Sequence, residues 1–231
     1  MFFFFKNKKI TLDCFTVDPL VHKYASPRRS IDFIPDWWKD LPVEDKNRNM
    51  KSCKGFTSFF KNSFILPYWQ SLYLTISDIN ERKYEWKNSK MPDPYDSQRP
   101  CIENHNPQQY AGYLDGNYQH IKLVSPWIFK STRKIKYMWS DPIWTRQDPN
   151  LYTILPGTVD YTINTSTEVN LLFQYKSESY DIDIRPNTPL VMLTPLTEEK
   201  VDLKTHLVTD REFKALTPGD MYAGVYTQEN T

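Results

Sequence analysis

The sequence predicts a mainly β protein, α+β at most, that folds as an antiparallel sandwich or a β-clip-like domain with a few short helices. Segments in which apolar and polar residues alternate follow one another at about ten-residue spacing in the second half of the chain, which is typical of sandwiches and barrels. Turn residues separate these segments. Pro186 and Asn187 suit a type II turn, because proline presets the first central position and asparagine tolerates a positive φ at the second.

The N-terminal part, residues 1–87, is expected to supply strands and short helices that pack on the main domain. Residues 2–18 read as one or two strands, and the Phe run at the start suits either a buried strand or an arm docked on a partner. Two prolines bracket residues 35–42, which predicts an ordered helical turn. Trp37 and Trp38 on this turn point about 100° apart, so we expect one to anchor on the β domain and the other to face a partner.

Apolar residues at helical spacing then predict a helix over residues 55–64 that ends near Pro67. Alternation predicts a hairpin, with one strand at residues 72–76 and a return strand around residues 84–86. Residues 88–118 read as a long loop rich in proline and asparagine. A loop of this length in a compact domain is usually functional or packed by its own side chains.

The C-terminal part divides into a β-rich domain, residues 119–208, and a short helix with a tail, residues 209–231. The helix is expected at residues 210–216, capped by Thr209 or Asp210. The period of two in the strands predicts which side chains face the core. They are Val169, Leu171, Phe173, Ile182, Ile184, Leu190 and Met192.

Composition argues against several kinds of partner. The 231 residues carry a net charge of +1, so no global field favours nucleic acid or an anionic membrane. The start is no signal peptide, because its charges follow the apolar run, and no segment approaches the roughly 20 apolar residues that span a bilayer. Cys14, Cys53 and Cys101 are odd in number and widely spaced, which indicates free thiols in a reducing cytosol.

The sequence contains no pattern of catalytic or metal-ligating residues. The four histidines lie far apart, no Gly-x-Ser-x-Gly elbow or Gly-rich phosphate loop occurs, and we expect neither a metal nor a cofactor. The polar stretch at residues 103–106, beside Cys101, would form a site if it joined Asp115 and His120. The interpretation that we favour is a polar loop.

Aromatic residues supply the remaining indication of function. The chain has 7 Trp, 15 Tyr and 13 Phe, and these side chains either fill a core or gather at an interface or a stacking surface. Amphipathic rings give large, rigid contact area at low entropy cost. The candidate binding residues are Trp37, Trp38, Trp69, Tyr110, Tyr113 and Trp144.

Five stretches carry a resemblance to known proteins. They are residues 34–42 (IPDWWKDLP), 53–56 (CKGF), 62–69 (NSFILPYW), 155–160 (LPGTVD) and 188–195 (TPL followed by TP). With these stretches, most of the chain resembles a family of uncharacterised proteins encoded by tailed phages of marine cyanobacteria. The resemblance implies a viral origin and no catalytic activity.

A second resemblance is local. Residues 121–196 are similar in layout to the β-clip fold of dUTPases and dCTP deaminases, and residues 157–160 (GTVD) match the segment that carries their water-activating aspartate. Asp160 is therefore the one transferable catalytic candidate. No Tyr-Arg-Gly-Glu, Pro-Arg-Ser-Gly or Gly-rich closing arm accompanies it, so Asp160 lacks the phosphate donors and Mg²⁺ ligands that hydrolysis needs. The resemblance extends to the shape and not to the activity.

The sequence as a whole predicts a non-enzymatic, phage-encoded binding or structural protein that acts through protein–protein contacts. It would be a virion component or a host-directed factor, located in the virion or the host cytoplasm, and it would assemble with a protein partner or with copies of itself. A dUTPase-like nucleotide hydrolase is one alternative. A carbohydrate-binding module that uses exposed Trp and Tyr rings is the other.

Overall fold

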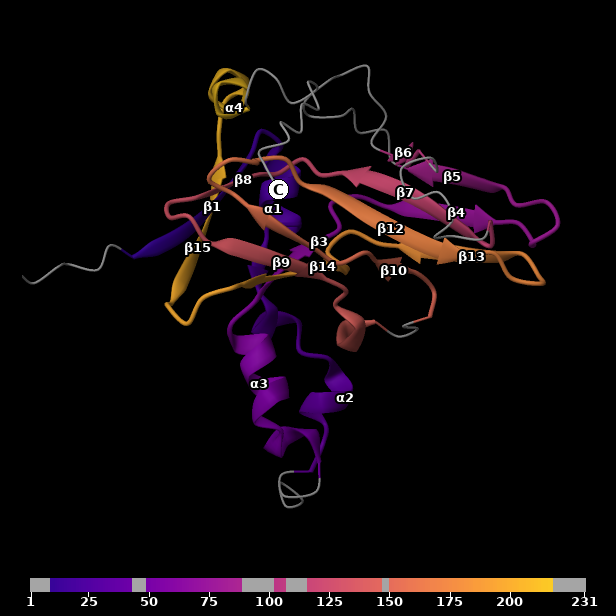
Figure 1. Cartoon of the computed structure of the whole chain (residues 1–231), viewed down its shortest axis with the longest axis horizontal. Coiled ribbons are helices and arrows are strands. Elements are labelled where there is room, and N and C mark those ends of the chain that lie inside the picture. The colour runs from indigo at the N-terminus through magenta and orange to yellow at the C-terminus, as the bar shows by residue number, and fades with distance from the viewer. Residues whose placement is uncertain (1–8, 43–48, 89–101, 107–115, 147–149, 218–231) are drawn as a thin grey trace, which may run out of the picture.

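The computed structural model describes residues 9–42, 49–88, 102–106, 116–146 and 150–217. Within these residues it confirms a mainly β, sandwich-like protein, in which strands β1–β15 form four sheets and the helices are few and short (Figure 1). Among the described strand pairs only β1–β15 is parallel, and the others have the expected antiparallel arrangement.

The first sheet joins segments that are far apart in the sequence. Its order is β15–β1–β8, with β1 at Ile10–Thr16, β8 at Ile128–Ser131 and β15 at Val201–Leu207. Strand β1 runs parallel to β15, with Ile10 opposite Val201, and antiparallel to β8. The N-terminal strand is therefore hydrogen-bonded into the same sheet as two strands of the predicted 119–208 domain.

Three further sheets complete the β body. The second has the order β10–β12–β7–β6, at Thr153–Ile154, Glu168–Gln174, Tyr118–Val124 and Ile102–Asn104. The third has the order β11–β9–β14–β3–β2, at Gly157–Asp160, Lys136–Ser140, Pro189–Pro195, Phe64–Pro67 and Arg28–Arg29. The fourth has the order β13–β4–β5, at Tyr180–Ile184, Leu72–Ile76 and Tyr84–Asn88.

Several local predictions are confirmed. Strands β4 and β5 form the predicted hairpin, and all seven side chains predicted to face inward are buried. Asn187 has a φ of 67°, and the backbone N–H of Thr188 donates to the carbonyl of Arg185 at 3.1 Å, as the predicted Pro-Asn turn requires. The α4 helix spans Asp210–Leu216, and Thr209 forms a capping box with Glu212.

One prediction near the N-terminus was wrong, and one helix there was not predicted. The helix expected over residues 55–64 is α3, which ends at Lys61, and Phe64–Pro67 is instead the β3 strand. All four β3 residues are buried between β14 and β2, and a fully buried apolar run looks the same in a strand as in a helix. The helix that was not predicted is α1 at Pro19–Tyr24, which begins with Asp18 as its N-cap and Pro19 in its first turn.

A single apolar core connects the sheets, and aromatic side chains supply much of its volume. The largest fully buried side chains include Trp127, Tyr68, Tyr137 and Tyr161. For these four residues, the expectation that aromatic side chains fill the core is therefore confirmed. Most of the long loop predicted at residues 88–118 lies outside the described residues, and within it the structure shows β6.

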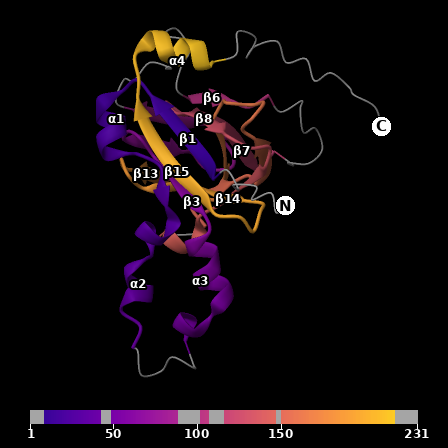
Figure 2. The same cartoon turned by 90° about the vertical axis from the view of Figure 1, so that its left-hand side faces the viewer.

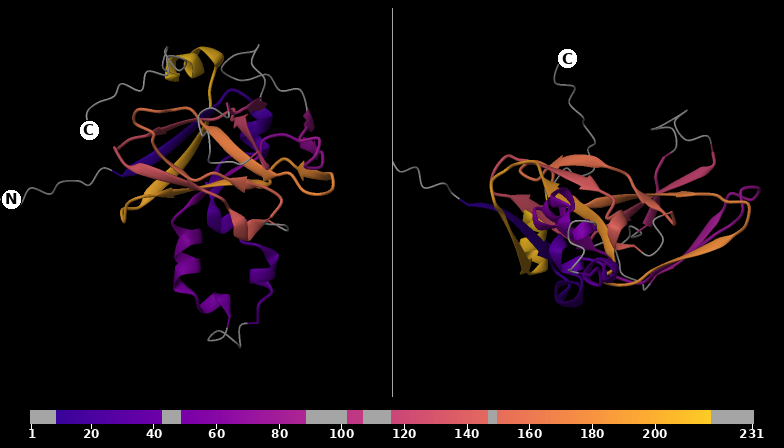
Figure 3. Two further views of the ribbon diagram at one scale, coloured as in Figure 1. Left: turned by 45° about the vertical axis from the view of Figure 1, so that its right-hand side comes forward. Right: turned by 90° about the horizontal axis from the view of Figure 1, so that it is seen from below.

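The second feature of the architecture is a helical projection, defined here as residues 35–42 and 49–62. It contains α2 at Asp36–Lys39, the 3₁₀ helix η2 at Met50–Ser52, and α3 at Lys54–Lys61. Figure 2 and the left view of Figure 3 show this projection extending away from the β body. A segment held outside the main core has surface that is free to contact another molecule.

Candidate functional site

The α3 helix divides the projection into an apolar side and a cationic side. The Cys53 Sγ accepts a hydrogen bond from the backbone N–H of Phe56, which starts the helix. Phe56 and Phe60 are buried on one face, whereas Lys54 and Lys61 are exposed. This separation at a period of 3.6 residues is why the segment folds as an amphipathic helix.

Phe56 lies at the centre of a cluster of aromatic rings that includes Trp37, Trp38 and Trp144. Its ring centroid is 5.9 Å from that of Trp37 and 6.1 Å from that of Trp38, which it meets in a stacked arrangement. The Trp144 ring meets the Phe56 ring edge-on at 5.5 Å. These separations are those of favourable aromatic pairs. Three of the candidate binding residues are thus brought together around one buried phenylalanine.

Two of these tryptophans present much of their surface to solvent. Trp37 is 43% exposed and Trp144 is 44% exposed, and their ring centroids are 6.4 Å apart. The indole Nε1 of Trp37 donates a long hydrogen bond, 3.4 Å, to the backbone carbonyl of Trp144. Ile143, which precedes Trp144 in the 3₁₀ helix η4 (Ile143–Thr145), is 46% exposed. We refer to Trp37, Trp38, Phe56, Ile143 and Trp144 as the aromatic platform.

Trp38 has the anchoring role that the sequence assigned to one of the two adjacent tryptophans. It is half-buried and stacks on Phe56, and the Nζ of Lys51 lies 5.5 Å from its ring centroid. Trp38 packs on α3 and not on the β domain. The indole that contacts the β-rich domain is that of Trp37, through Trp144, so both indoles hold α2 in place.

An ion pair fixes the segment that carries Trp144. The Arg146 guanidinium contacts the Asp141 carboxylate, and it also donates to the carbonyl of Tyr152 and lies 4.3 Å from the Tyr152 ring centroid. The second Asp141 oxygen accepts from the backbone N–H of Ile154 at 3.0 Å. Burial raises the pKa of Asp141, and the Arg146 charge opposes this rise. These contacts hold η4 against β10.

The remaining candidate binding residues do not join the platform. Trp69 is buried in the core beside Tyr68, with 6% of its surface exposed and a ring separation of 4.8 Å. Tyr110 and Tyr113 lie outside the described residues. Phe56 and Ile143 were not among the candidate binding residues. The helical spacing of the apolar residues predicted that Phe56 is buried. Only the fold shows that three tryptophans surround it.

Asp160 lies at the end of β11 and serves a turn. Its carboxylate accepts hydrogen bonds from the backbone N–H of Thr162 at 2.9 Å and from its hydroxyl at 2.6 Å. These bonds, with smaller contributions from Lys134 and Lys136, lower the pKa of the Asp160 carboxyl. The arrangement is an Asx turn that closes the β11 strand.

A polar cluster with a cavity of about 410 Å³ lies between β5, β6 and β7. The His105 and His120 rings stack here, and the Tyr84 hydroxyl and the Gln119 amide both donate to the Asn104 side chain. The structure thus joins His120 to the predicted 103–106 stretch, whereas Asp115 and Cys101 lie outside the described residues. Burial, together with the nearby His105, lowers the pKa of His120 to about 4.

Within the residues that the structure describes, no three His, Cys, Asp or Glu side chains gather to hold a metal ion. No helix in the same residues is long and apolar enough to cross a membrane. The described cysteines, Cys14 and Cys53, are free thiols. No protein-family model, curated protein or solved structure matches the chain.

Proposed function

We propose that this chain is a non-enzymatic, phage-encoded binding or structural protein, and that it acts by docking its aromatic platform on another protein. The observation that carries the proposal is the contact between Trp37 on the projection and Trp144 on η4, two tryptophans that are each more than two fifths exposed. Ile143, which precedes Trp144 in η4, is exposed to a similar extent. Isolated exposed apolar residues are common on any surface, whereas several large ones in contact mark an interaction site.

The geometry of the platform favours a protein partner. Tryptophan is the residue type most enriched among side chains that dominate binding energy at interfaces. The Phe56 ring contacts the rings of both Trp37 and Trp144, and the hydrogen bond from the Trp37 indole to the Trp144 backbone carbonyl further restrains the Trp37 ring before any partner arrives. Ordering these side chains on binding therefore costs little conformational entropy.

Affinity capture with matched baits tests this proposal. The wild-type chain, a Trp37→Ala/Trp144→Ala variant and a Trp86→Ala variant would be immobilised and exposed to lysate of infected host cells, with quantitative mass spectrometry of the bound proteins. Trp86 is a suitable control because it is 41% exposed and lies on β5, away from the projection.

The expected result is at least one protein retained by the wild type and by Trp86→Ala but lost from the double variant. Equal retention by all three baits, or no specific partner of the wild type, would overturn the proposal. Sedimentation of the same three proteins at several concentrations shows whether the partner is a second copy. Identification of the chain in purified virions would place it among virion components.

Enzymatic function has its own test. The purified chain is expected to leave dUTP and dCTP intact with and without Mg²⁺, because the sequence lacks phosphate-binding motifs and the Asp160 carboxylate is bound by Thr162. Hydrolysis that disappears in an Asp160→Asn variant would instead establish the dUTPase-like alternative.

A further inference from the structure

The opposite side of the projection carries a second surface with a different chemistry. The solvent face of α3 presents Lys54, Thr57, Ser58, Lys61 and Asn62, at the i, i+3, i+4, i+7 and i+8 spacing of one helix face. These residues line a shallow cavity of about 290 Å³. The face contains hydroxyl, amide and ammonium groups, and it contains no acidic residue.

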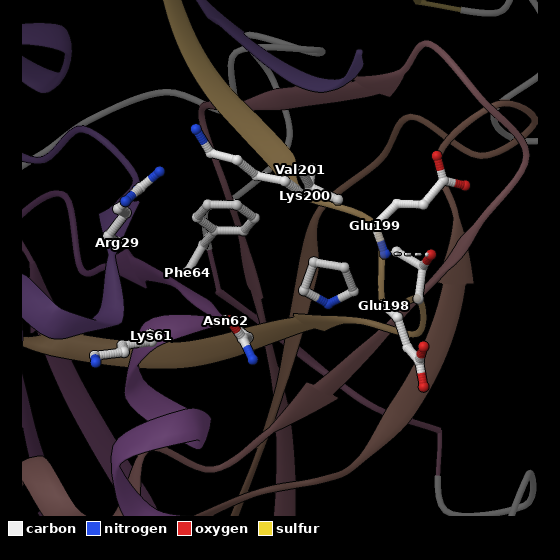
Figure 4. Close-up of a pocket in the computed structure, with 10 residues that line it drawn as sticks. Arg29, Lys61, Asn62, Phe64, Glu198, Glu199, Lys200 and Val201 are labelled. Carbon is white, nitrogen blue, oxygen red and sulfur yellow. Dashed lines mark hydrogen bonds between the residues drawn. The ribbon is translucent and has the colours of Figure 1, made fainter. Parts of the chain in front are cut away.

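A second cavity, of about 280 Å³, continues this surface onto the β body. Lys61 and Asn62 line both cavities, and Arg29 and Lys200 join them at the second, above Phe64. Figure 4 shows the nitrogen-bearing ends of Arg29, Lys61 and Lys200 toward one side, and the carboxylates of Glu198 and Glu199 toward the other.

Most of these cations are available to a ligand. Among the described residues, Arg29, Lys54 and Lys61 have no carboxylate within ion-pair distance. The Asp202 carboxylate forms ion pairs with two lysines: the Nζ of Lys200 lies 3.3 Å from it and the Nζ of Lys9 lies 3.8 Å from it. Of the two acidic side chains that line the second cavity, Glu199 is paired with Arg133 at 2.6 Å, and Glu198 lies beside it.

We infer that this surface, which we call the cationic track (Arg29, Lys54, Lys61 and Lys200 with Asn62), binds the phosphate backbone of a nucleic acid. Lys54 and Lys61 are separated by two helical turns, about 10 Å along the axis, which is more than a single phosphate group can bridge. A row of cations in a groove, with hydroxyl and amide donors between them, fits a chain of phosphodiesters.

An anionic membrane fits the track less well. Helices that bind a membrane surface place large apolar residues beside their cations, so that these residues enter the lipid. In α3 the large apolar residues Phe56 and Phe60 are buried on the opposite side, and the track is concave.

The net charge of +1 for the whole chain does not reveal this local concentration of positive charge. The inference does not rest on the proposed docking of the aromatic platform.

Fluorescence anisotropy with labelled DNA tests the inference. The full chain would be titrated against a short fluorescein-labelled single strand and against the matching duplex, at about 50 and 200 mM salt. The test variant is Lys54→Gln/Lys61→Gln. The matched control is Lys130→Gln/Lys214→Gln, which removes the same charge from exposed positions on β8 and α4. Thermal melts confirm that both variants fold.

We expect the wild type and the control to bind at least one probe, and the test variant to bind it roughly tenfold more weakly. The slope of log affinity against log salt should fall by about 1 to 2 in the test variant, because two cation–phosphate contacts are lost. Absence of binding to both probes would overturn the inference, as would equal weakening in the two variants. So would binding to phosphatidylglycerol vesicles without binding to DNA.

Discussion

The imidazole rings of His105 and His120 stack with a centroid separation of 4.1 Å, and the backbone N–H of His105 donates to the carbonyl of His120 at 3.1 Å. The Nε2 of His120 also lies 3.0 Å from the Asn170 side-chain oxygen. Burial is the main reason that the pKa of His120 falls to about 4, and the neighbouring His105 and Lys122 lower it further. The folded protein therefore holds His120 in its neutral form.

This pair predicts a loss of stability in mild acid. The unfolded imidazole, with its ordinary pKa of 6.5, takes up a proton as the pH falls, whereas the folded one does so only near pH 4. The unfolded state thus binds more protons between these values, so the free energy of unfolding decreases as the pH falls from 6.5 to 4. We expect His120 to contribute about 2 kcal/mol to this decrease, since solvent in the adjoining cavity screens part of the effect.

Urea unfolding at several pH values measures this contribution. A His120→Gln variant keeps a hydrogen-bonding side chain and removes the titration, so its stability should depend less steeply on pH than that of the wild type between pH 6.5 and 4. The difference between the two curves isolates His120 from other groups. Curves with the same slope would show that His120 is not responsible.

Phe56 is predicted to determine the stability of the projection. It is 6% exposed and contacts Trp37, Trp38 and Trp144, so Phe56→Ala leaves a cavity beneath all three rings. We expect a loss of about 3 kcal/mol in the free energy of unfolding, and a red shift of the tryptophan emission. Phe59→Ala is the matched control because Phe59 is half-buried on the same helix. A similar loss in both variants would contradict a central role for Phe56.

The sequence predicted most of the β architecture because its strands show the required alternation. The period-two pattern in β12, β13 and β4 identified their inward faces, and Pro186-Asn187 identified the turn before β14. Strand partners were harder to predict. The parallel pairing of β1 with β15 joins the two ends of the described chain, and no local pattern encodes it.

The candidate site was only partly predictable for a related reason. Adjacent residues on a helical turn point about 100° apart, which singled out Trp37 and Trp38 from the sequence alone, and in the structure both rings contact Phe56 from different sides of α2. Their assembly with Trp144 depends on α3 packing against both α2 and η4, and this is a property of the tertiary structure. Trp69 is also a tryptophan but lies in the core, so residue type alone could not distinguish a buried tryptophan from one exposed on the platform.

The Asp141–Arg146 ion pair is predicted to position Trp144. The Arg146 side chain is 5% exposed, so Asp141→Asn leaves a buried positive charge without its counterion. We expect a loss of about 3 kcal/mol in the free energy of unfolding, together with weaker partner binding by the platform. Asp183→Asn is the control, because it breaks an ion pair with Arg185, whose side chain is 80% exposed. Chemical denaturation should show a large effect for the first variant and little change for the second.

A buried hydrogen bond between Trp139 and Tyr161 is predicted to stabilise the third sheet against the core. The Trp139 Nε1 donates to the Tyr161 hydroxyl at 2.7 Å, and both residues are almost fully buried. Tyr161→Phe removes the acceptor and leaves the indole N–H buried without it, which should cost about 2 kcal/mol. Trp139→Phe removes the donor but also shrinks the side chain, so it should cost more.

A double-mutant cycle separates the hydrogen bond from the packing. If the bond is the main contribution of the Tyr161 hydroxyl, Tyr161→Phe should cost much less in a Trp139→Phe background than in the wild type, because no buried donor then remains unsatisfied. The coupling free energy should be about 1 kcal/mol or more by urea unfolding. Additive losses would show that the two side chains stabilise the protein independently and that their hydrogen bond adds nothing to packing.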